Sequence, residues 1–365
     1  MSQRKIRAVY MRGGTSRCLV FREGDLPHPG PARDRILLAA LGSPDPYGRQ
    51  LDGLGGGISS LSKACIVGAP SHPEADVDYT FAQVDVRSPV VEYHGNCGNC
   101  SSAIGPFAID ERLVAAQEGE TIVRVHNTNT KKVIVAHVPT RDGEAAIEGD
   151  FELAGVAGRG ARIALDFLEP GGAGTGRLLP TGSARDVIAG VEASCVDATN
   201  PLVFVRARDV GLTAGETPSA VDANADVMAR LEKIRVEAAM RMGLPTSASA
   251  PKIAFVAAPA DYVALDGVRH AAGDYDVLAR AISMGNCHRA FPLTSAMCLA
   301  VAARIEGTLV HEVARRHAGD VRLGHASGVL PLDAKVATRD GAPWAERVTV
   351  YRTARRLMEG FVRVP

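Results

Sequence analysis

Near its start the chain carries Val9-Tyr-Met-Arg-Gly-Gly-Thr-Ser-Arg-Cys-Leu-Val-Phe-Arg-Glu-Gly-Asp-Leu26, which predicts a strand, a polar turn and a second strand. Past the middle, Ser194-Cys-Val-Asp-Ala-Thr-Asn-Pro-Leu-Val-Phe-Val-Arg-Ala-Arg-Asp-Val-Gly-Leu212 predicts the same arrangement. The two Leu-Val-Phe triplets begin 183 positions apart, about half of the 365 residues. A repeat at this separation indicates a duplicated unit.

The elements that follow the two copies also agree. Each copy is followed by apolar residues at helical spacing, by strand-like runs, by a Gly-Asn-Cys loop that opens an apolar helical stretch, and by further strands. In the first half we predict these elements at residues 31–41, 64–67, 77–86, 95–97, 103–113 and 121–138. In the second half we predict them at residues 220–242, 253–257, 285–287, 293–305 and 321–336. Pro106 removes a backbone donor inside the first apolar stretch, so we expect a short or bent helix there.

The duplication predicts the α+β fold class, with a helix packed against or inside a curled sheet in each half. The Gly/Pro-rich stretch 169–182 is the expected connector, which gives one domain at 1–185 and a second at 186–349. A last strand is predicted at 347–364, and we expect its part from about 350 to 365 to return to the first domain. A duplicated unit leaves a cleft at its pseudo-twofold interface, where a site is expected.

The composition argues against several classes of protein. Positive and negative side chains number 41 each, so no overall field favours nucleic acid or a membrane surface. We find no apolar run of about 18 residues and no apolar segment of a signal peptide, and we expect a cytoplasmic protein. The seven cysteines form no regular framework, so reduced thiols are expected.

The segment His94-Gly-Asn-Cys-Gly-Asn-Cys-Ser-Ser-Ala-Ile-Gly105 carries the strongest chemical signal. Glycines beside Cys97, just before an apolar helix, would aim backbone N–H groups at a bound carboxylate and at charge that develops on it. A thiol there is suited to give or take a proton. Cys97 as a buried structural thiol stays an alternative, and so does a zinc site, because His94, Cys97 and Cys100 have the spacing H-x2-C-x2-C.

Two further positions in the first half are suited to the same chemistry. Lys63 precedes a buried-looking strand, where a partly desolvated amine loses its proton more easily. A lysine on the surface at a strand end is the alternative. The loop Arg12-Gly-Gly-Thr-Ser16 offers a cation and two hydroxyls to a carboxylate, although a plain hairpin turn has the same pattern.

The second half has its own candidates. Ser283-Met-Gly-Asn-Cys-His-Arg289 and Leu293-Thr-Ser-Ala296 precede or open the equivalent helix, and Gly324-His-Ala-Ser-Gly328 lies in a later strand connection. Cys287 would then mirror Cys97 as a second acid/base thiol, and it competes with Lys63 for the role of partner.

At these residues the chain resembles the PrpF family, the 2-methylaconitate cis-trans isomerases and their relatives, which include oxalomesaconate tautomerases and methylitaconate isomerases. The matching stretches occur in order along nearly the whole chain: Tyr10–Ser16, Gly42–Gly48, Gln50–Gly56, Ser60–Lys63, His94–Asn99, Gly105–Ala108, Leu178–Gly182, Asp197–Pro201 and Arg352–Gly360. Three places depart from the family pattern and put the identity of the substrate in doubt: Arg17-Cys18, Leu293–Ala296 and Gly324–Gly328.

The resemblance implies a diaminopimelate-epimerase-like fold, in which two pseudo-symmetric domains, each a curled sheet or barrel around a central helix, hold the site between them. It also implies neither metal nor organic cofactor, and it places the acid/base pair on Lys63 and Cys97, which favours Lys63 over Cys287. The residues that we expect to bind substrate are Arg12, Gly14, Thr15, Ser16, Asn96, Gly98, Asn99, Met284, Thr294, Ser295, His325 and Ser327.

The sequence therefore predicts an isomerase or tautomerase that transfers a proton on an unsaturated di- or tricarboxylate such as 2-methylaconitate or oxalomesaconate. We expect a small polycarboxylate as its partner, neither nucleic acid nor membrane, and a homodimer as the assembly to test. A two-thiol amino-acid racemase or epimerase that uses Cys97 and Cys287 is the alternative enzyme. A zinc- or carboxylate-binding protein without turnover is the alternative of another class.

Overall fold

The two repeated stretches form antiparallel strand pairs in the computed structural model, which describes residues 3–93, 96–247 and 250–365. The chain divides into unit 1, Met1–Phe167 with Tyr351–Pro365, and unit 2, Leu168–Val350. The domain ranges expected from the sequence, 1–185 and 186–349, stay a prediction.

Unit 1 is built on a sheet whose strands follow the order β23-β1-β2-β3-β4-β6-β7-β11. The β2–β3 and β4–β6 pairs are parallel and the others antiparallel. Its main strands are β1 (Arg4–Gly13), β2 (Ser16–Arg22), β3 (Lys63–Gly68), β4 (Val77–Val84), β6 (Gly119–Asn127), β7 (Lys132–Arg141), β11 (Ile163–Leu168) and β23 (Ala354–Val364). Shorter strands are β5 (Val91–Glu92), β8 (Glu144–Ala145), β9 (Phe151–Glu152) and β10 (Arg159–Gly160).

Unit 2 repeats this topology with the order β12-β13-β14-β15-β18-β20-β21-β22. Its parallel pairs, β14–β15 and β18–β20, occupy the same positions in the strand order as the β2–β3 and β4–β6 pairs of unit 1. Its main strands are β12 (Asp186–Ile188), β13 (Val191–Ala198), β14 (Asn200–Arg206), β15 (Lys252–Ala257), β18 (Val277–Ser283), β20 (Val321–His325), β21 (Gly328–Arg339) and β22 (Ala342–Arg352). Shorter strands are β16 (Tyr262–Val263), β17 (Arg269–His270) and β19 (Asn286–Cys287).

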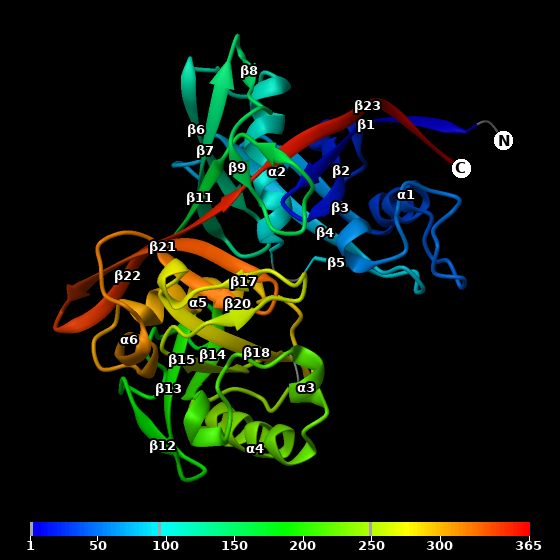
Figure 1. The fold of residues 1–365 in the computed structure, drawn as a ribbon. Helices are drawn as coiled ribbons and strands as arrows, with labels where there is room; N and C mark the ends of the chain where they lie inside the picture. Colours follow the sequence, from blue (N-terminus) through cyan, green and yellow to red (C-terminus); the bar gives the residue numbers. More distant parts are fainter. Residues whose placement is uncertain (1–2, 94–95, 248–249) are drawn as a thin grey trace. The chain divides into compact units, whose positions relative to one another are not determined.

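Each unit has one apolar helix that contacts many strands of its sheet. In unit 1, α2 (Gly98–Asp110) contacts β1 to β4, β6 to β8 and β23, so the sheet curls around it (Figure 1). In unit 2, α5 (Leu293–Ala303) contacts β13, β14, β20 and β21. Both helices are buried along most of their length, as a helix that is apolar all round requires. The predicted α+β class with a central helix in a curled sheet is confirmed.

The opposite face of each sheet packs against an amphipathic helix. Alternate residues of β2 and β3, such as Leu19 and Ile66, form an apolar core with Ile36 and Leu37 of α1 (Pro31–Leu41). In unit 2 the corresponding helix is α4 (Ala225–Arg241), whose Leu231 packs on β14 and β15. Because strand side chains alternate between faces, each sheet separates two cores. The remaining helices are α3 (Pro218–Asp222) and α6 (Leu309–Val313).

The structure corrects three expectations about single elements. The stretch 220–242 forms two helices, because α3 ends at Asp222 and Asn224 then caps the start of α4. The predicted strand 347–364 is interrupted at Thr353, since β22 pairs with β21 and β23 pairs with β1 (Figure 1). The helix through Pro106 was expected to be short or bent; it is not short, because α2 continues for 13 residues, and a bend stays a prediction.

Among the helices in the described part of the chain, we find none with the length and apolar character needed to cross a lipid bilayer.

A pair of substitutions in β23 tests whether this strand completes the core of unit 1. Val362 is 8% exposed in the core with α1, whereas its neighbour Phe361 is 61% exposed. Val362→Asp should lower the free energy of unfolding by at least about 3 kcal/mol, because it buries an unpaired carboxylate. Phe361→Asp should cost no more than about 1 kcal/mol. Urea unfolding followed by circular dichroism measures both, and equal losses would contradict the placement of β23.

Candidate active site

Lys63 lies on the face of the sheet that packs against α2. Ala64 and Ile66 point into the core with α1, so the alternate residues Lys63 and Cys65 point to the opposite face. The β3–β4 register pairs Lys63 with Gln83 and thereby puts both side chains on that face. Because side chains alternate between the two faces along β3, the Lys63 amine points toward α2.

Lys63 is 8% exposed, which is rare for a lysine without a carboxylate partner. Its ammonium donates to Oε1 of Gln83 and lies 5.0 Å from the centre of the Phe81 ring. The Gln83 amide in turn donates to the carbonyl of Ser62 at 2.9 Å. Within the described residues no ion pair involves Lys63. The amine is thus held by a neutral amide and an aromatic face.

Cys97 is the N-cap residue of α2 and is half-buried. The first intrahelical bond runs from the Ser101 N–H to the Cys97 carbonyl at 2.9 Å, which leaves the amides of Gly98 and Asn99 ahead of it. The Cys100 N–H donates to the Cys97 sulfur at 3.5 Å. A hydrogen bond with the Cys100 thiol, and then burial, raise the pKa of Cys97, while the Lys63 charge opposes this rise. Because β3, which begins at Lys63, contacts α2, the amine and the thiol at the helix start lie on the same side of the sheet.

The turn between β1 and β2 packs directly on the start of α2. A Cβ on Gly13 would lie 2.6 Å from the Asn99 carbonyl oxygen, so only glycine permits this contact. Gly14 has a φ of +52°, and a Cβ there would clash with Oδ1 of the Asn99 side chain. Across this contact the Asn99 side chain donates to the Thr15 hydroxyl at 3.0 Å.

Arg352, which the sequence reading did not assign to the site, lies at this same contact. Its Nε donates to Oδ1 of Asn99 at 3.1 Å, and it is 5% exposed. Burial lowers the pKa of Arg352 to about 10, and the nearby Cys97 opposes this shift. In the described part of the chain no ion pair involves Arg352. Lys63 and Arg352 are therefore two buried cations near one thiol, neither with a carboxylate beside it.

Arg12 holds the turn to the β22–β23 junction. Its Nη1 donates to the carbonyl and hydroxyl of Thr353, both at 2.9 Å, and to the Gly14 carbonyl at 3.0 Å. Ser16 is buried at the start of β2. These bonds give Arg12 a clear structural task in addition to the carboxylate binding that the sequence predicts.

Asn96 is held in place from two sides. Its Oδ1 accepts from the Ser101 hydroxyl at 3.1 Å and from the Asn127 side chain at 3.5 Å. Unit 1 thus brings together the predicted residues around the start of α2 and the β1–β2 turn: Arg12, Gly14, Thr15, Asn96, Cys97, Gly98 and Asn99. The signal for Arg352 was present in the Arg352–Gly360 stretch of the resemblance, whereas nothing local marked Gln83.

The remaining predicted residues belong to unit 2. Met284 and Gly285, both at positive φ, form the turn between β18 and β19. Thr294 and Ser295 begin α5, and the hydroxyl of Ser295 is buried without a hydrogen-bond partner among the described residues.

The last two predicted residues of unit 2 lie at the β20–β21 hairpin, His325 at the end of β20 and Ser327 in the turn. His325 is buried, and burial followed by the charge of Arg280 lowers its pKa to about 3. The Ser327 hydroxyl donates to the Arg289 carbonyl at 2.6 Å. At neutral pH His325 is therefore uncharged and suits hydrogen bonding rather than charge pairing.

The sequence suggested that Cys287 mirrors Cys97, but the structure places the two cysteines in different elements. It lies in β19, six residues before α5, where Pro292 is the N-cap. Its side chain belongs to the core that α4 covers, and its N–H donates to Asp222 at 2.7 Å. Burial raises the pKa of this thiol to about 12. The two Gly-Asn-Cys stretches are alike in sequence but occupy different elements.

The zinc alternative depends on His94, which lies outside the described residues. Cys97 and Cys100 are in contact with each other at the start of α2. The structure therefore leaves that alternative untested.

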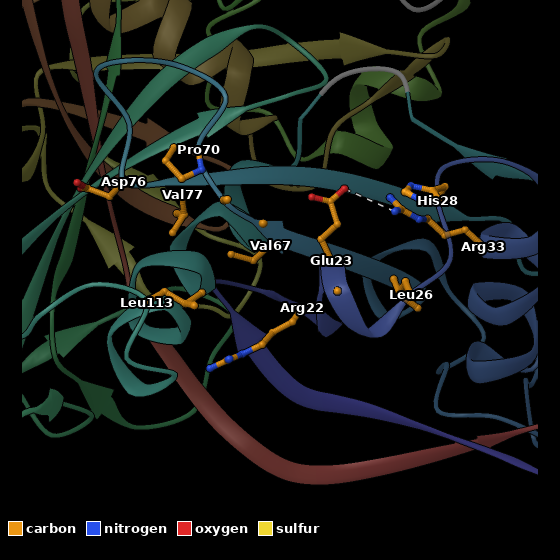
Figure 2. A pocket seen from close by; sticks show the side chains of 13 residues that line it. Arg22, Glu23, Leu26, His28, Arg33, Val67, Pro70, Asp76, Val77 and Leu113 are labelled. Carbon is orange, nitrogen blue, oxygen red and sulfur yellow. Dashed lines mark ion pairs between the residues drawn. The ribbon is translucent and has the colours of Figure 1, made fainter.

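A separate pocket of about 890 Å³ lies on another part of unit 1 (Figure 2). It is lined by the segment from Arg22 to Arg33 and by residues near the ends of β3 and β4. Three of its charged residues form ion pairs, Arg33 with Glu23 at 3.5 Å and Arg22 with Glu111 at 3.0 Å. None of the predicted site residues lines it, so we assign it no role in the chemistry.

Proteins of known function are similar to this chain over its whole length. The 3-methylitaconate isomerase of Eubacterium barkeri is 43% identical over 99% of this chain and 98% of its own length. The 2-methyl-aconitate isomerase of Cupriavidus necator is 42% identical over 100% and 98%, and the 4-oxalomesaconate tautomerase of Pseudomonas putida is 38% identical over 99% and 97%.

Solved structures with a similar fold are also found. A crystal structure of methylitaconate-delta-isomerase matches with a TM-score of 0.93 and 42% identity, covering 100% of this chain and 96% of that one. A probable proline racemase from Agrobacterium radiobacter matches with a TM-score of 0.52 and 12% identity, covering 99% and 93%, which shows the epimerase-like fold alone. The model of the PrpF protein family matches residues 3–365, and the chain therefore belongs to the PrpF family.

Proposed function

We propose that this chain is an isomerase that moves a proton on an unsaturated di- or tricarboxylate, with Lys63 and Cys97 as the acid/base pair. The isomerase class follows from membership of the PrpF family and from full-length relatives named as isomerases. The observation that carries the proposal is the pair of buried cations, Lys63 on β3 and Arg352 at Asn99, which face the helix that Cys97 caps and have no carboxylate partners among the described residues. Buried charges are normally paired, so a polyanionic substrate would supply the missing charge.

The proposed step is a 1,3-allylic proton shift. One of Lys63 and Cys97 removes a proton from the carbon beside a double bond that is conjugated to a carboxylate. Electron density then moves onto the carboxylate oxygens, and the other group returns a proton at the far end or face. The Gly98 and Asn99 amides at the start of α2 support the developing negative charge. The step uses side chains and backbone amides alone.

Substrate binding is proposed for groups around the same helix start. Arg352 offers a guanidinium to one carboxylate, and Thr15 and Asn99 offer a hydroxyl and an amide. The roles predicted for the residues of unit 2 stay predictions, namely Met284, Thr294, Ser295, His325 and Ser327. A homodimer and a cytoplasmic location are also parts of the proposal.

The buried position of Cys287 favours the lysine and thiol pair over the two-thiol alternative. Cys287 lies in β19 within the core that α4 covers and not at a helix start, so it lacks the free backbone N–H groups that follow Cys97. Metal analysis of the purified protein tests the zinc alternative.

The acid/base pair is tested by proton exchange in D2O, followed by NMR on a panel of methylitaconate, 2-methylaconitate and oxalomesaconate. The wild type should exchange and isomerise at least one of them. Lys63→Ala and Cys97→Ser should each lower kcat by about 10²- to 10⁴-fold, the usual contribution of a positioned acid or base.

Two control variants separate proton transfer by Lys63 from a role of its positive charge alone, and Cys97 from the alternative thiol Cys287. Lys63→Arg keeps the positive charge but cannot give up its proton near neutrality, so it should be as inactive as Lys63→Ala. Cys287→Ala should stay largely active. Recovery of activity in Lys63→Arg, or equal loss in Cys287→Ala, would contradict the assigned pair.

We expect the positive charge of Arg352 to contribute mainly to substrate binding, and so to KM. Arg352→Gln should reduce kcat/KM by about 10- to 100-fold, chiefly through KM, because a hydrogen bond to a charged group contributes about 1.5–3 kcal/mol. Arg363→Gln, which removes an exposed arginine from the next strand, β23, is the matched control and should leave KM unchanged. Steady-state kinetics measures both variants, and an unaltered KM in Arg352→Gln would count against carboxylate binding there.

A further inference from the structure

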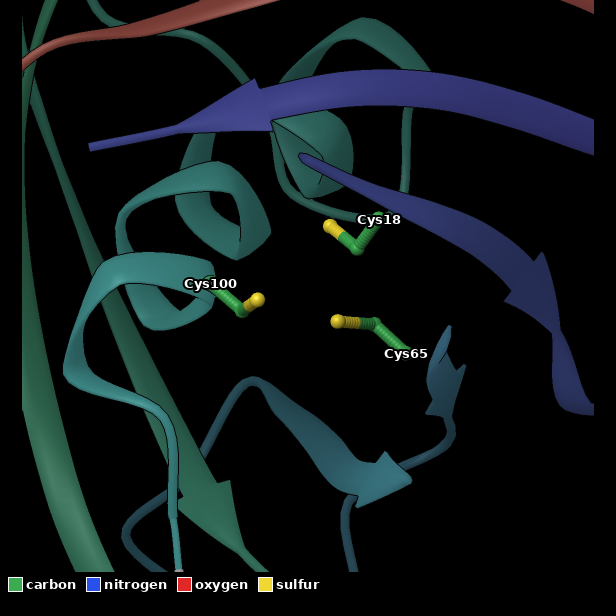
Figure 3. Close-up of side chains that lie close together, drawn as sticks. All are labelled: Cys18, Cys65 and Cys100. Atoms are coloured by element: carbon green, nitrogen blue, oxygen red, sulfur yellow. The ribbon is translucent and has the colours of Figure 1, made fainter. Parts of the chain in front are cut away.

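Three cysteines outside the proposed acid/base pair converge in the core of unit 1. Cys18 comes from β2, Cys65 from β3 and Cys100 from the first turn of α2. Their sulfur atoms all lie within 4.8 Å of one another, and all three residues are fully buried. Figure 3 shows the three side chains pointing toward a common centre. We call these residues the thiol cluster.

The strand register explains this convergence. The β2–β3 register pairs Val20 with Cys65, so Cys18 and Cys65 share one face of the sheet. That face packs against α2, whose first turn carries Cys100. Three segments that are separated in sequence by 47 and 35 positions thus each direct one sulfur atom to the same point.

We propose that the thiol cluster is a binding site for one monovalent thiophilic metal ion, Cu(I), held by the three sulfur atoms. All three donors are sulfur, and soft sulfur donors select soft ions such as Cu(I) rather than Mg²⁺ or Ca²⁺. Among the described residues this is the one group of three or more potential ligands that lie close enough to share an ion.

The number of ligands favours Cu(I) over zinc. Structural zinc sites are closed by four protein ligands, and the cluster has three. Cu(I) is commonly bound by two or three thiolates, so the three sulfur atoms can complete its coordination, with the displaced thiol protons released to solvent.

Cys97 is a neighbour of this site and not one of its ligands. The Cys97 thiol contacts Cys100, but it does not belong to the group whose sulfur atoms are mutually within 4.8 Å. One ligand of the ion, Cys100, would therefore also contact the proposed acid/base thiol. The site does not depend on the proposed isomerase function, because it rests on the positions of Cys18, Cys65 and Cys100 alone.

The test is an anaerobic titration of the reduced, full-length protein with Cu(I), in competition with the chelator bicinchoninate. We expect one Cu(I) per chain for the wild type, and an X-ray absorption spectrum with sulfur as the nearest shell. Cys18→Ser and Cys65→Ser should each weaken retention of Cu(I) by at least 10-fold. Circular dichroism checks that each variant is folded, and loading during refolding from urea supplies the ion where the folded core admits it slowly.

Two matched variants make the result specific. Cys298→Ser replaces a buried thiol of unit 2 that donates to the Val196 carbonyl at 3.4 Å, a bond that a hydroxyl can keep. It should bind Cu(I) like the wild type, and so should Cys97→Ser. Binding that survives in Cys65→Ser, or that is lost in Cys97→Ser, would overturn the assignment. Failure to retain Cu(I) against the chelator, or a preference for Zn(II) under the same conditions, would also overturn it.

Discussion

The close backbone contact between the β1–β2 turn and the start of α2 is the constraint on which the rest of unit 1 depends. Gly13 and Gly14 touch Asn99 at distances that no Cβ permits. This contact joins Thr15, Asn99 and Arg352 in one hydrogen-bonded group beside Cys97. Because Arg12 ties the same turn to Thr353, the end of the chain is held at the site as well. The two glycines thus link the sheet, the central helix and the last strand.

Much of the fold was predictable, because hydrophobic periodicity depends on short stretches of sequence. The helix at 31–41 and the repeat of strand, helix, strands and helix needed no contact between distant residues. The second Gly-Asn-Cys stretch was misleading for a physical reason. In unit 2, Met284 and Gly285 both adopt positive φ and turn the chain back on β18, so Asn286 and Cys287 become a strand. A local pattern cannot distinguish this hairpin from a helix start.

The site was predictable only where its chemistry is local. Glycines around Cys97 indicate a thiol at a helix start, and the structure places it at the N-cap of α2. The contact of Lys63 with Gln83 depends instead on the register of two antiparallel strands. The contact of Arg352 with Asn99 joins residues 253 positions apart, and Arg352 reaches it because β23, which follows two residues later, pairs with β1. Such partners follow from topology, so a single sequence marks them only through resemblance to a family.

The same curled sheet that buries α2 also buries two cations, and the negative charge of the substrate would offset the cost of their desolvation. A sheet wrapped around an apolar helix removes water from Lys63 and Arg352, which are 8% and 5% exposed. Desolvation penalises both cations, and Gln83, Phe81 and Asn99 offset that cost only in part, because none of them carries a charge. A bound polycarboxylate offsets more, since each carboxylate brings a full negative charge into the same low dielectric. Substrate affinity and core formation are therefore two consequences of one packing arrangement.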